Sequence, residues 1–241
     1  MIYLYLVLGG LAGAFIQSGT GFGSAIVMMN IFPLLLPADQ SIIICQLTCL
    51  VMSSAILFRC YRHIQWRICV PLLIPALILT GVSSFLAGGM ESSTLKTLLG
   101  FIFIGLSIFF SFIAPNIHFR PTPILSVITG SLSGIANGLF SMGGPPAILY
   151  LAPALDDKTE YLATTQFFFL ATNLMSISVR LASGQATTSA FLYALVSSFG
   201  AIIGTILGCK AVSRINSTVL KRIIYIFIGI NGLVIVSQRL F

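Results

Sequence analysis

Two glycine-rich clusters, each inside a long apolar segment, carry the side chains that could bind a ligand. They read QSGTGFG at residues 17–23 and NGLFSMGGPP at residues 137–146. Their amides and hydroxyls can donate hydrogen bonds to the oxygen atoms of a small anion. Additional polar side chains occur singly in neighbouring apolar segments. The complete set of candidate binding residues is Gln17, Ser18, Thr20, Gly21, Gly23, Gln46, Asn137, Ser141, Gly143, Gly144, Gln166 and Asn173.

Glycine and proline interrupt both segments near their middle. The apolar segments Leu4–Leu36 and Ile124–Leu155 are too long for one membrane span of about 20 residues and too short for two full spans with a turn. Glycine lowers helix propensity by about 1 kcal/mol, and internal proline by about 3 kcal/mol. We therefore predict two short helices in each segment, joined by non-helical backbone. The second helix is expected to begin near Ser24 in one segment and near Pro145 in the other.

The composition indicates a protein surrounded by lipid. Of the 241 residues, 57% are hydrophobic and 7% are charged, whereas a soluble domain carries about 25% charged residues. The net charge of +7 arises mainly between apolar runs, as at residues 59–67 and 210–222. This distribution is typical of loops that determine membrane topology and not of a nucleic-acid groove. We predict an all-α integral membrane protein, whose first apolar segment is mature structure and not a signal peptide.

The two halves of the chain are related in sequence. Three glycine pairs share a constant offset: Gly9 and Gly130, Gly13 and Gly134, Gly23 and Gly144. Downstream, Gln46 matches Gln166. We predict a duplication with repeats at residues 1–119 and 120–241, which together form one transmembrane domain. Each repeat is expected to hold one glycine-broken hairpin and three transmembrane helices, which gives about eight to ten membrane segments.

Loop charge determines the expected orientation. If each long segment returns to its starting side, or crosses as two tilted short spans, the basic segments 59–67 and 210–222 share the inner side of the membrane. The outer side then receives both termini, Asp39, Glu91 and the loop Arg180–Thr188. Equivalent loops of the two halves carry different charge, as expected if the repeats are inverted.

Inverted repeats with broken helices are the architecture of secondary transporters. A helix N-terminus presents N–H donors and about half a positive charge. Two such N-termini, meeting where the repeats contact each other, would form an anion site without an intramembrane lysine or arginine. For Gln17, Thr20, Asn137 and Ser141 we favour a binding role, because broken membrane helices must face a cavity. For the other polar candidates, hydrogen bonding between neighbouring helices is an equally good interpretation.

Two further patterns have structural interpretations. Glycines at four-residue spacing, as in Gly200, Gly204 and Gly208, permit close helix packing. Cys45 and Cys49 share a helix face, but the chain has no CxxC pair, so buried packing is the better interpretation.

The glycine patterns also resemble those of a known family. GxxxG at residues 9–13 leads to GFG at 21–23, and GxxxG at 130–134 leads to GGPP at 143–146. Together with the basic loop Arg62–Arg67, these patterns resemble the TauE/SafE family of sulfite-exporter-like membrane proteins over essentially the whole chain. The resemblance implies export of sulfite, an organosulfonate or a related small anion across the bacterial inner membrane.

The first glycine cluster departs from the usual Gly-Gly-Gly run of the family. Phe22 lies between the glycines and Ser24 follows them. Both differences could alter the shape of the binding site.

We therefore expect a secondary transporter that moves sulfite or an organosulfonate by alternating access. The alternative is an ion channel built on the glycine-rich breaks, although a selectivity filter needs a ring of like carbonyl groups and the two clusters differ. An enzyme is not expected, because Ser141 has no histidine within a span to act as its base. No cofactor is expected, and no His/Cys/Asp cluster has the spacing of a metal site. The expected partners are the small anionic substrate and the lipid bilayer but no nucleic acid, and a homodimer stays open.

Overall fold

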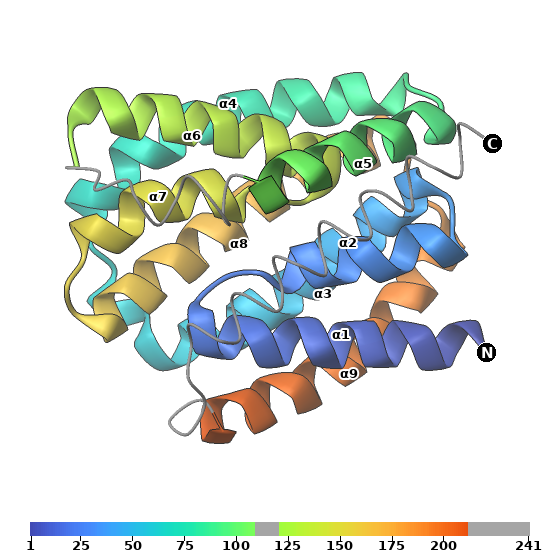
Figure 1. Cartoon of the computed structure of the whole chain (residues 1–241), viewed down its shortest axis with the longest axis horizontal. Helices are drawn as coiled ribbons and strands as arrows, with labels where there is room; N and C mark the ends of the chain where they lie inside the picture. Colours follow the sequence, from blue (N-terminus) through green and yellow to red (C-terminus); the bar gives the residue numbers. More distant parts are fainter. Residues whose placement is uncertain (109–120, 212–241) are drawn as a thin grey trace.

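The computed structural model describes residues 1–108 and 121–211, and every element within these ranges is a helix. The helices, shown in Figure 1, are α1 (Ile2–Thr20), α2 (Ser24–Leu35), α3 (Ala38–Cys60), the 3₁₀ turn η1 (Tyr61–His63), α4 (Trp66–Gly88), α5 (Ser92–Ile108), α6 (Pro123–Phe140), α7 (Gly144–Ala154), α8 (Lys158–Ala182) and α9 (Thr188–Ala211). The predicted all-α class is confirmed. The predicted junction near residue 119, the basic residues at 214–222 and the last apolar segment lie outside the described residues.

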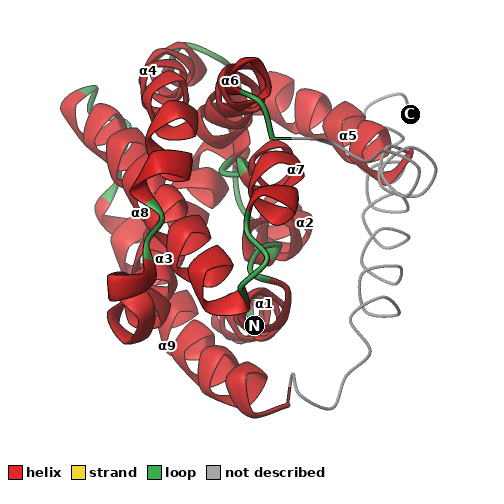
Figure 2. Ribbon diagram, turned by 90° about the vertical axis from the view of Figure 1, so that its left-hand side faces the viewer, coloured by secondary structure: helices red, strands yellow, loops and turns green. Residues whose placement is uncertain are grey.

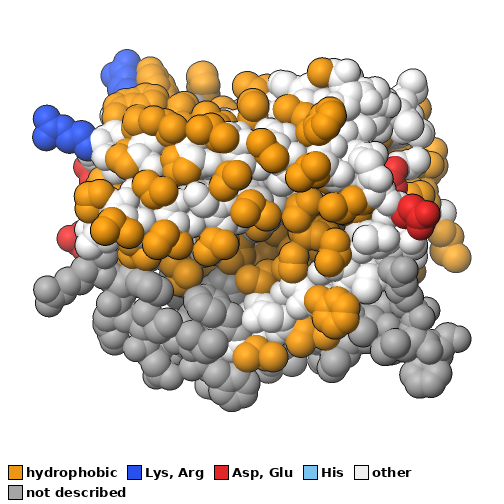
Figure 3. Space-filling model, turned by 90° about the horizontal axis from the view of Figure 1, so that it is seen from above, with side chains coloured by type: hydrophobic (Ala, Val, Ile, Leu, Met, Phe, Trp, Pro, Cys, Tyr) orange, Lys and Arg blue, Asp and Glu red, His pale blue; other side chains and the backbone are white. Residues whose placement is uncertain are grey.

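Six of the described helices are long and apolar enough to cross a membrane: α1, α3 with η1, α4, α6, α8 and α9. The helices α2 and α5 are apolar but shorter. Large hydrophobic side chains such as Phe58, Phe85 and Phe199 are exposed on the surface, and apolar side chains cover much of the face shown in Figure 3. Such a surface suits lipid and not water. The predicted multi-pass membrane character is confirmed.

Both long apolar segments are broken at the predicted glycine clusters. Residues 21–23 separate α1 from α2, and residues 141–143 separate α6 from α7. Gly21 and Gly23 have φ angles of 82° and 103°, which glycine adopts without steric penalty. After each break the chain turns back along the preceding helix, so each segment is a hairpin. Figure 2 shows the hairpins α1–α2 and α6–α7 stacked one above the other, with α3 and α8 beside them.

Glycines let two helix pairs approach each other closely. The helix α1 packs on α9, and α4 packs on α6. A Cβ atom added to Gly200 of α9 would lie 2.1 Å from the carbonyl oxygen of Val7 on α1. One added to Gly134 of α6 would lie 2.4 Å from the carbonyl oxygen of Ala76 on α4. The predicted role of these regularly spaced glycines in close packing is confirmed.

The helix contacts repeat when the two halves of the chain are exchanged. In chain order, α1 to α4 correspond to α6 to α9. Under this exchange the pair α1/α9 becomes α6/α4, and the pair α3/α9 becomes α8/α4; all of these pairs are in contact. The helices α3 and α8 exchange with each other, and they pack together. In Figure 1, α1 runs from right to left and α6 runs from left to right, so these corresponding helices have opposite directions.

The two ends of the helix bundle differ in charge. The α3–α4 and α7–α8 connections lie at one end in Figure 1; Arg62, Arg67 and Lys158 lie in or next to them, together with Asp156, Asp157 and Glu160. Figure 3 shows the Lys and Arg side chains of its visible face at this end, whereas Asp or Glu side chains are visible at both ends. Asp39, at the start of α3, and Glu91, between α4 and α5, lie at the opposite end. We call these the basic end and the acidic end.

The sequence analysis predicted that Arg180 lies in an outer loop, and this prediction was wrong. The helix α8 continues to Ala182, and the Arg180 side chain in its last turn is only 1% exposed. Its guanidinium donates to the carbonyl oxygen of Gly138 in α6, at 2.6 Å. The error arose because the sequence shows only that a charged residue follows an apolar run. The carbonyl group that accepts the hydrogen bond from Arg180 comes from a different part of the chain.

Candidate functional site

A small cavity lies where the two broken hairpins meet. The polar and glycine residues that line it from the breaks are Gln17, Gly23, Ser24, Asn137, Ser141, Gly143 and Gly144. The cavity has a volume of about 20 Å³, which is room for about one water molecule. The two breaks therefore share one small cavity.

The middle turns of α3 and α8 complete the cavity wall. Cys49 and Ser53 of α3 line it, as do Phe169 and Asn173 of α8. Cys49 and Phe169 are 120 residues apart, and so are Ser53 and Asn173. Corresponding turns of the two halves thus face the same cavity.

Four buried polar atoms of the cavity wall have no hydrogen-bond partner within the described residues. They are Oγ of Ser53, Nδ2 of Asn137, Oγ of Ser141 and Oδ1 of Asn173. Their side chains are at most 4% exposed. A buried polar atom without a partner costs about 1–3 kcal/mol, so four around one cavity call for a physical reason. The amide nitrogen and the two hydroxyls are donors, and a bound anion would satisfy them.

Gln17 is fixed at the cavity by side chains from two other helices, α8 and α2. Its Nε2 donates to Oε1 of Gln166, at 2.9 Å. Its Oε1 accepts a hydrogen bond from the hydroxyl of Ser24, and this hydroxyl lies 3.5 Å from the sulfur of Cys49. Both ends of the Gln17 amide are therefore engaged, and the side chain forms an ordered part of the wall.

Two glutamines support the breaks, each from the opposite half of the chain. Gln166 of α8 donates its Nε2 to the carbonyl oxygen of Gly21, at 2.9 Å. Gln46 of α3 donates to the carbonyl oxygen of Asn137, at 3.2 Å, and to the hydroxyl of Ser176, at 2.7 Å. Carbonyl groups at an interrupted membrane helix need partners, because lipid offers none; the carbonyl of Asn137 also accepts from the N–H of Ser141, at 2.8 Å.

Both returning helices begin at the cavity wall. The helix α2 begins at Ser24, and its next residues, Ala25 and Ile26, also line the cavity. The first backbone N–H groups of a helix have no acceptor within it and carry partial positive charge. The helix α7 begins at Gly144, but its next two residues are prolines, which have no N–H group. The backbone donors available at the cavity therefore come mainly from α2.

Ser141 has an unusual backbone conformation at the second break. Its φ angle is 62°, the single positive φ of a non-glycine residue in the described ranges. A left-handed conformation costs about 1–2 kcal/mol for a residue with a Cβ atom. The presence of serine where glycine would be less strained agrees with a function of its unpartnered hydroxyl.

The structure brings seven of the predicted residues to the cavity: Gln17, Gly23, Asn137, Ser141, Gly143, Gly144 and Asn173. Gly21, Gln46 and Gln166 lie in the supporting contacts behind it. Ser18 and Thr20 do not line the cavity. The Ser18 hydroxyl donates to its own helix at the carbonyl oxygen of Ala14, at 2.7 Å, and the Thr20 hydroxyl donates to the carbonyl oxygen of Phe22, at 2.6 Å.

The sequence analysis missed eight lining residues: Ser24, Ala25, Ile26, Cys49, Ser53, Met142, Pro145 and Phe169. Cys45, Cys49 and Ser53 follow one another at four-residue spacing, which places them on one helix face. This spacing was the sequence signal that could have identified the cavity face of α3. No sequence signal identified Phe169, because an aromatic residue in an apolar helix does not show which neighbour it contacts.

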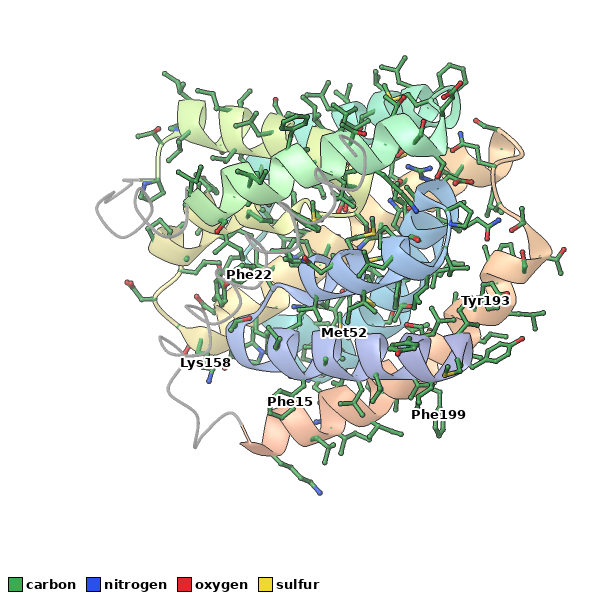
Figure 4. The ribbon with its side chains drawn as sticks, turned by 45° about the vertical axis from the view of Figure 1, so that its right-hand side comes forward. Phe15, Phe22, Met52, Lys158, Tyr193 and Phe199 are labelled. Atoms are coloured by element: carbon green, nitrogen blue, oxygen red, sulfur yellow. The ribbon has the colours of Figure 1, made fainter. Side chains whose placement is uncertain are left out.

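Phe22, which lies between Gly21 and Gly23, contacts the second hairpin beside the cavity. Figure 4 labels Phe22 at the turn between α1 and α2. The side chain is 5% exposed and packs in an apolar cluster with Ala147 and Phe168 of the second half. A Cβ atom added to Gly144 would lie 3.7 Å from the Cβ atom of Phe22. The first break thus meets the second directly at this residue.

The chain is similar to known proteins over nearly its whole length. The family model described as Sulfite exporter TauE/SafE matches residues 5–235. A relative from Cupriavidus necator, named Probable sulfite/organosulfonate exporter TauE, is 23% identical over 233 residues, which cover 92% of this chain and 89% of the relative. No solved structure matches the chain. The chain, with its membrane helices and paired breaks, belongs to the sulfite exporter TauE/SafE family of membrane transport proteins.

Proposed function

We propose that the chain transports a small sulfur-containing anion, sulfite or an organosulfonate, and that the anion binds in the cavity between the two hairpins. The observation that carries this proposal is the set of unpartnered polar atoms on Ser53, Asn137, Ser141 and Asn173. Three of these atoms can donate to anion oxygens, and the start of α2 adds N–H groups and partial positive charge. The name of the Cupriavidus necator relative supports this class of substrate.

Transport through this site requires the cavity to open. With room for about one water molecule, the cavity is too small for an anion of four or more heavy atoms. We infer alternating access, in which the hairpins move relative to α3 and α8 and expose the cavity to each end in turn. The hydrogen bonds from Gln166 to Gly21 and from Gln46 to Asn137 connect these parts, so they are the contacts expected to change.

Two inverted repeats, residues 1–119 and 120–241, would give both openings related geometry. The exchange of the pair α1/α9 with α6/α4 supports this arrangement, and so do the opposite directions of α1 and α6. The shared position of Ser53 and Asn173 on the cavity wall supports it as well.

We infer that the basic end faces the cytoplasm of a bacterial cell, and that both termini lie outside the inner membrane. Arg62, Arg67 and Lys158 at the basic end favour this orientation. An impermeant thiol reagent should modify the single-cysteine variants Glu91→Cys and Gly184→Cys in intact cells. The variant Arg62→Cys should react only after the membrane is permeabilised, and the reverse pattern would contradict the orientation.

A native cysteine in the cavity wall allows a direct test of binding. Cys49 is 4% exposed, so a thiol reagent that carries a sulfonate should reach it only when the cavity opens. Sulfoacetate is the competitor of choice, because sulfite would consume the reagent. We expect saturating sulfoacetate to slow modification of Cys49 in proteoliposomes by about tenfold, as measured by peptide mass spectrometry.

The same experiment contains its controls. Chloride at equal ionic strength should not protect Cys49. Cys69 of α4 is buried with Leu72 and Ala76 in the same apolar cluster as Phe22 but does not line the cavity, and sulfoacetate should not change its modification. Equal protection of Cys49 and Cys69 would indicate a general conformational effect and would contradict binding in the cavity.

Flux assays then separate transport from binding. Proteoliposomes should be loaded with sulfite, sulfoacetate, taurine or sulfate, with and without a pH gradient. The variant Asn137→Leu, which removes a donor from the wall, should insert into the membrane but lose sulfite flux and the protection of Cys49. Unchanged flux would refute this site, and unitary currents in a planar bilayer would favour the channel alternative.

A further inference from the structure

One guanidinium is fully buried beside the second hairpin. Arg180 is 1% exposed. Its Nη2 donates to the carbonyl oxygen of Gly138, at 2.6 Å, and its Nη1 donates to Oε1 of Gln185, at 3.0 Å. Its Nε is buried and has no partner within the described residues. Both acceptors are neutral, so the positive charge has no direct counter-ion in these contacts.

The nearest carboxylate does not compensate this charge by contact. The charge of Asp39 acts on Arg180, but no carboxylate oxygen of the described residues lies within 4.0 Å of the guanidinium. Oδ1 of Asp39 is itself buried without a partner. An unpaired buried cation is strongly unfavourable, and an ionisable residue within a membrane segment is a candidate functional group for that reason.

Arg180 stands on the same face of α8 as the cavity residue Asn173. Asn173, Ser176 and Arg180 follow at spacings of three and four residues and are all buried, so they form one stripe. Two helical turns, about 10 Å, separate the first from the last. The Ser176 hydroxyl contacts Ser84 at 2.6 Å and accepts from Gln46 at 2.7 Å. The interior between the cavity and the guanidinium is therefore polar.

The corresponding face of α3 toward the basic end is different. At the same separation of 120 residues, Asn173 corresponds to Ser53, Ser176 to Ile56 and Arg180 to Cys60. Ile56 and Cys60 are buried and uncharged. Thus the two directions out of the cavity are not equivalent, and the polar, cationic one leads toward the acidic end.

We propose that Arg180 is a second anion-binding residue, placed between the central cavity and the acidic end of the transporter. This inference rests on the proposed function. An oxyanion that leaves the cavity along α8 would displace the carbonyl of Gly138 and the amide of Gln185 from the guanidinium. Hydrogen bonds between two charged groups are stronger than those to neutral acceptors, and the planar fork of arginine suits two oxygens of one sulfite or sulfonate group. Arg180 then holds this end closed without the anion and binds the anion during its passage.

The first test compares Arg180→Gln with Arg180→Lys in proteoliposomes. We expect Arg180→Gln to lower the maximal rate of sulfite flux by about tenfold or more, while the concentration of sulfoacetate that protects Cys49 changes little. Arg180→Lys keeps the charge but not the fork, so it should retain part of the flux with a raised KM. Lys96→Gln, which removes one positive charge from α5, is the matched control and should transport like the parent protein.

A second variant covers the case in which Arg180→Gln does not fold. Gln185→Glu places a fixed carboxylate at the oxygen that already accepts from Arg180. We expect its melting temperature to equal or exceed that of the parent, while its sulfite flux falls by about tenfold, because the guanidinium is then occupied. A purely structural arginine would instead leave flux unchanged in Gln185→Glu, and this result would overturn the inference. If sulfoacetate does not protect Cys49 even in the parent protein, this result contradicts the proposed binding of the anion in the cavity, and not only the role of Arg180.

Discussion

The side-chain amide of Gln166 donates a hydrogen bond to the carbonyl oxygen of Gly21, 2.9 Å away, across the contact between the two halves of the chain. Gln46, from the first half, donates to the carbonyl oxygen of Asn137 in the second half. A helix that is interrupted within a membrane leaves carbonyl groups that lipid cannot satisfy. Each half of this protein therefore stabilises the broken helix of the other half, and this mutual support keeps both breaks beside one cavity.

Loss of the Gln166 amide should destabilise the protein. Gln166→Leu leaves the carbonyl of Gly21 and Nε2 of Gln17 without their partner, and we expect a loss of about 2 kcal/mol in unfolding free energy. Thermal unfolding in detergent measures it. Thr172→Val is the control, because the Thr172 hydroxyl bonds only within α8. A Gln166→Leu protein that melts with the parent would show that the contact is not needed.

Ser141→Gly should separate stability from binding. Glycine adopts the φ of 62° with less strain, so the variant should gain about 1 kcal/mol of stability. It loses the unpartnered hydroxyl, and we expect about tenfold weaker protection of Cys49 by sulfoacetate. Ser141→Ala should bind equally weakly but be less stable than Ser141→Gly. Unchanged protection in both variants would exclude the hydroxyl as a ligand.

The size of the side chain at position 144 should decide transport. A Cβ atom on Gly144 would meet Phe169 at 3.5 Å and Phe22 at 3.7 Å, which is ordinary contact. Gly144→Ala should therefore retain sulfite flux, whereas Gly144→Leu should fill the cavity and abolish flux without preventing insertion. Equal flux in the two variants would contradict the position of the site.

Substitution of Gly200 should disrupt the packing of α1 on α9. A Cβ atom there would lie 2.1 Å from the carbonyl oxygen of Val7, so Gly200→Ala should cost about 1–3 kcal/mol of stability. Gly105 of α5 is the control, because a Cβ atom there would meet no described atom within 4 Å. Melting temperatures of Gly200→Ala and Gly105→Ala compare the two sites, and equal values would disprove the close approach.

The start of α8 should respond to acid. Hydrogen bonds from the backbone N–H groups of Glu160 and Thr159 lower the pKa of Asp157. A lowered pKa in the folded state means that this stabilisation is present at neutral pH and disappears as the pH falls below about 4. Asp157→Ala should thus melt below the parent at pH 7, with a difference that shrinks in acid. Asp157→Asn, which can still cap the helix, should show a weaker pH dependence than the parent.

The sequence alone determined the properties that depend on local composition. Apolar runs of known length predicted the membrane helices, because the thickness of the bilayer sets the length of a span. Glycine and proline predicted the breaks at residues 21–23 and 141–143, because their helix propensity is low in any context. Repeated glycines and the family resemblance predicted the relation between the halves and the class of protein.

Only the tertiary structure decided which side chains meet at the cavity. In a membrane helix both the lipid-facing and the protein-facing sides are apolar, so no hydrophobic pattern marks the inner face. The sequence therefore did not show that Ser18 and Thr20, in the last turn of α1, do not line the cavity, or that Cys49 and Ser53 line it from a separate helix. Arg180 shows the same limit, because its burial depends on a carbonyl group 42 positions earlier in the chain.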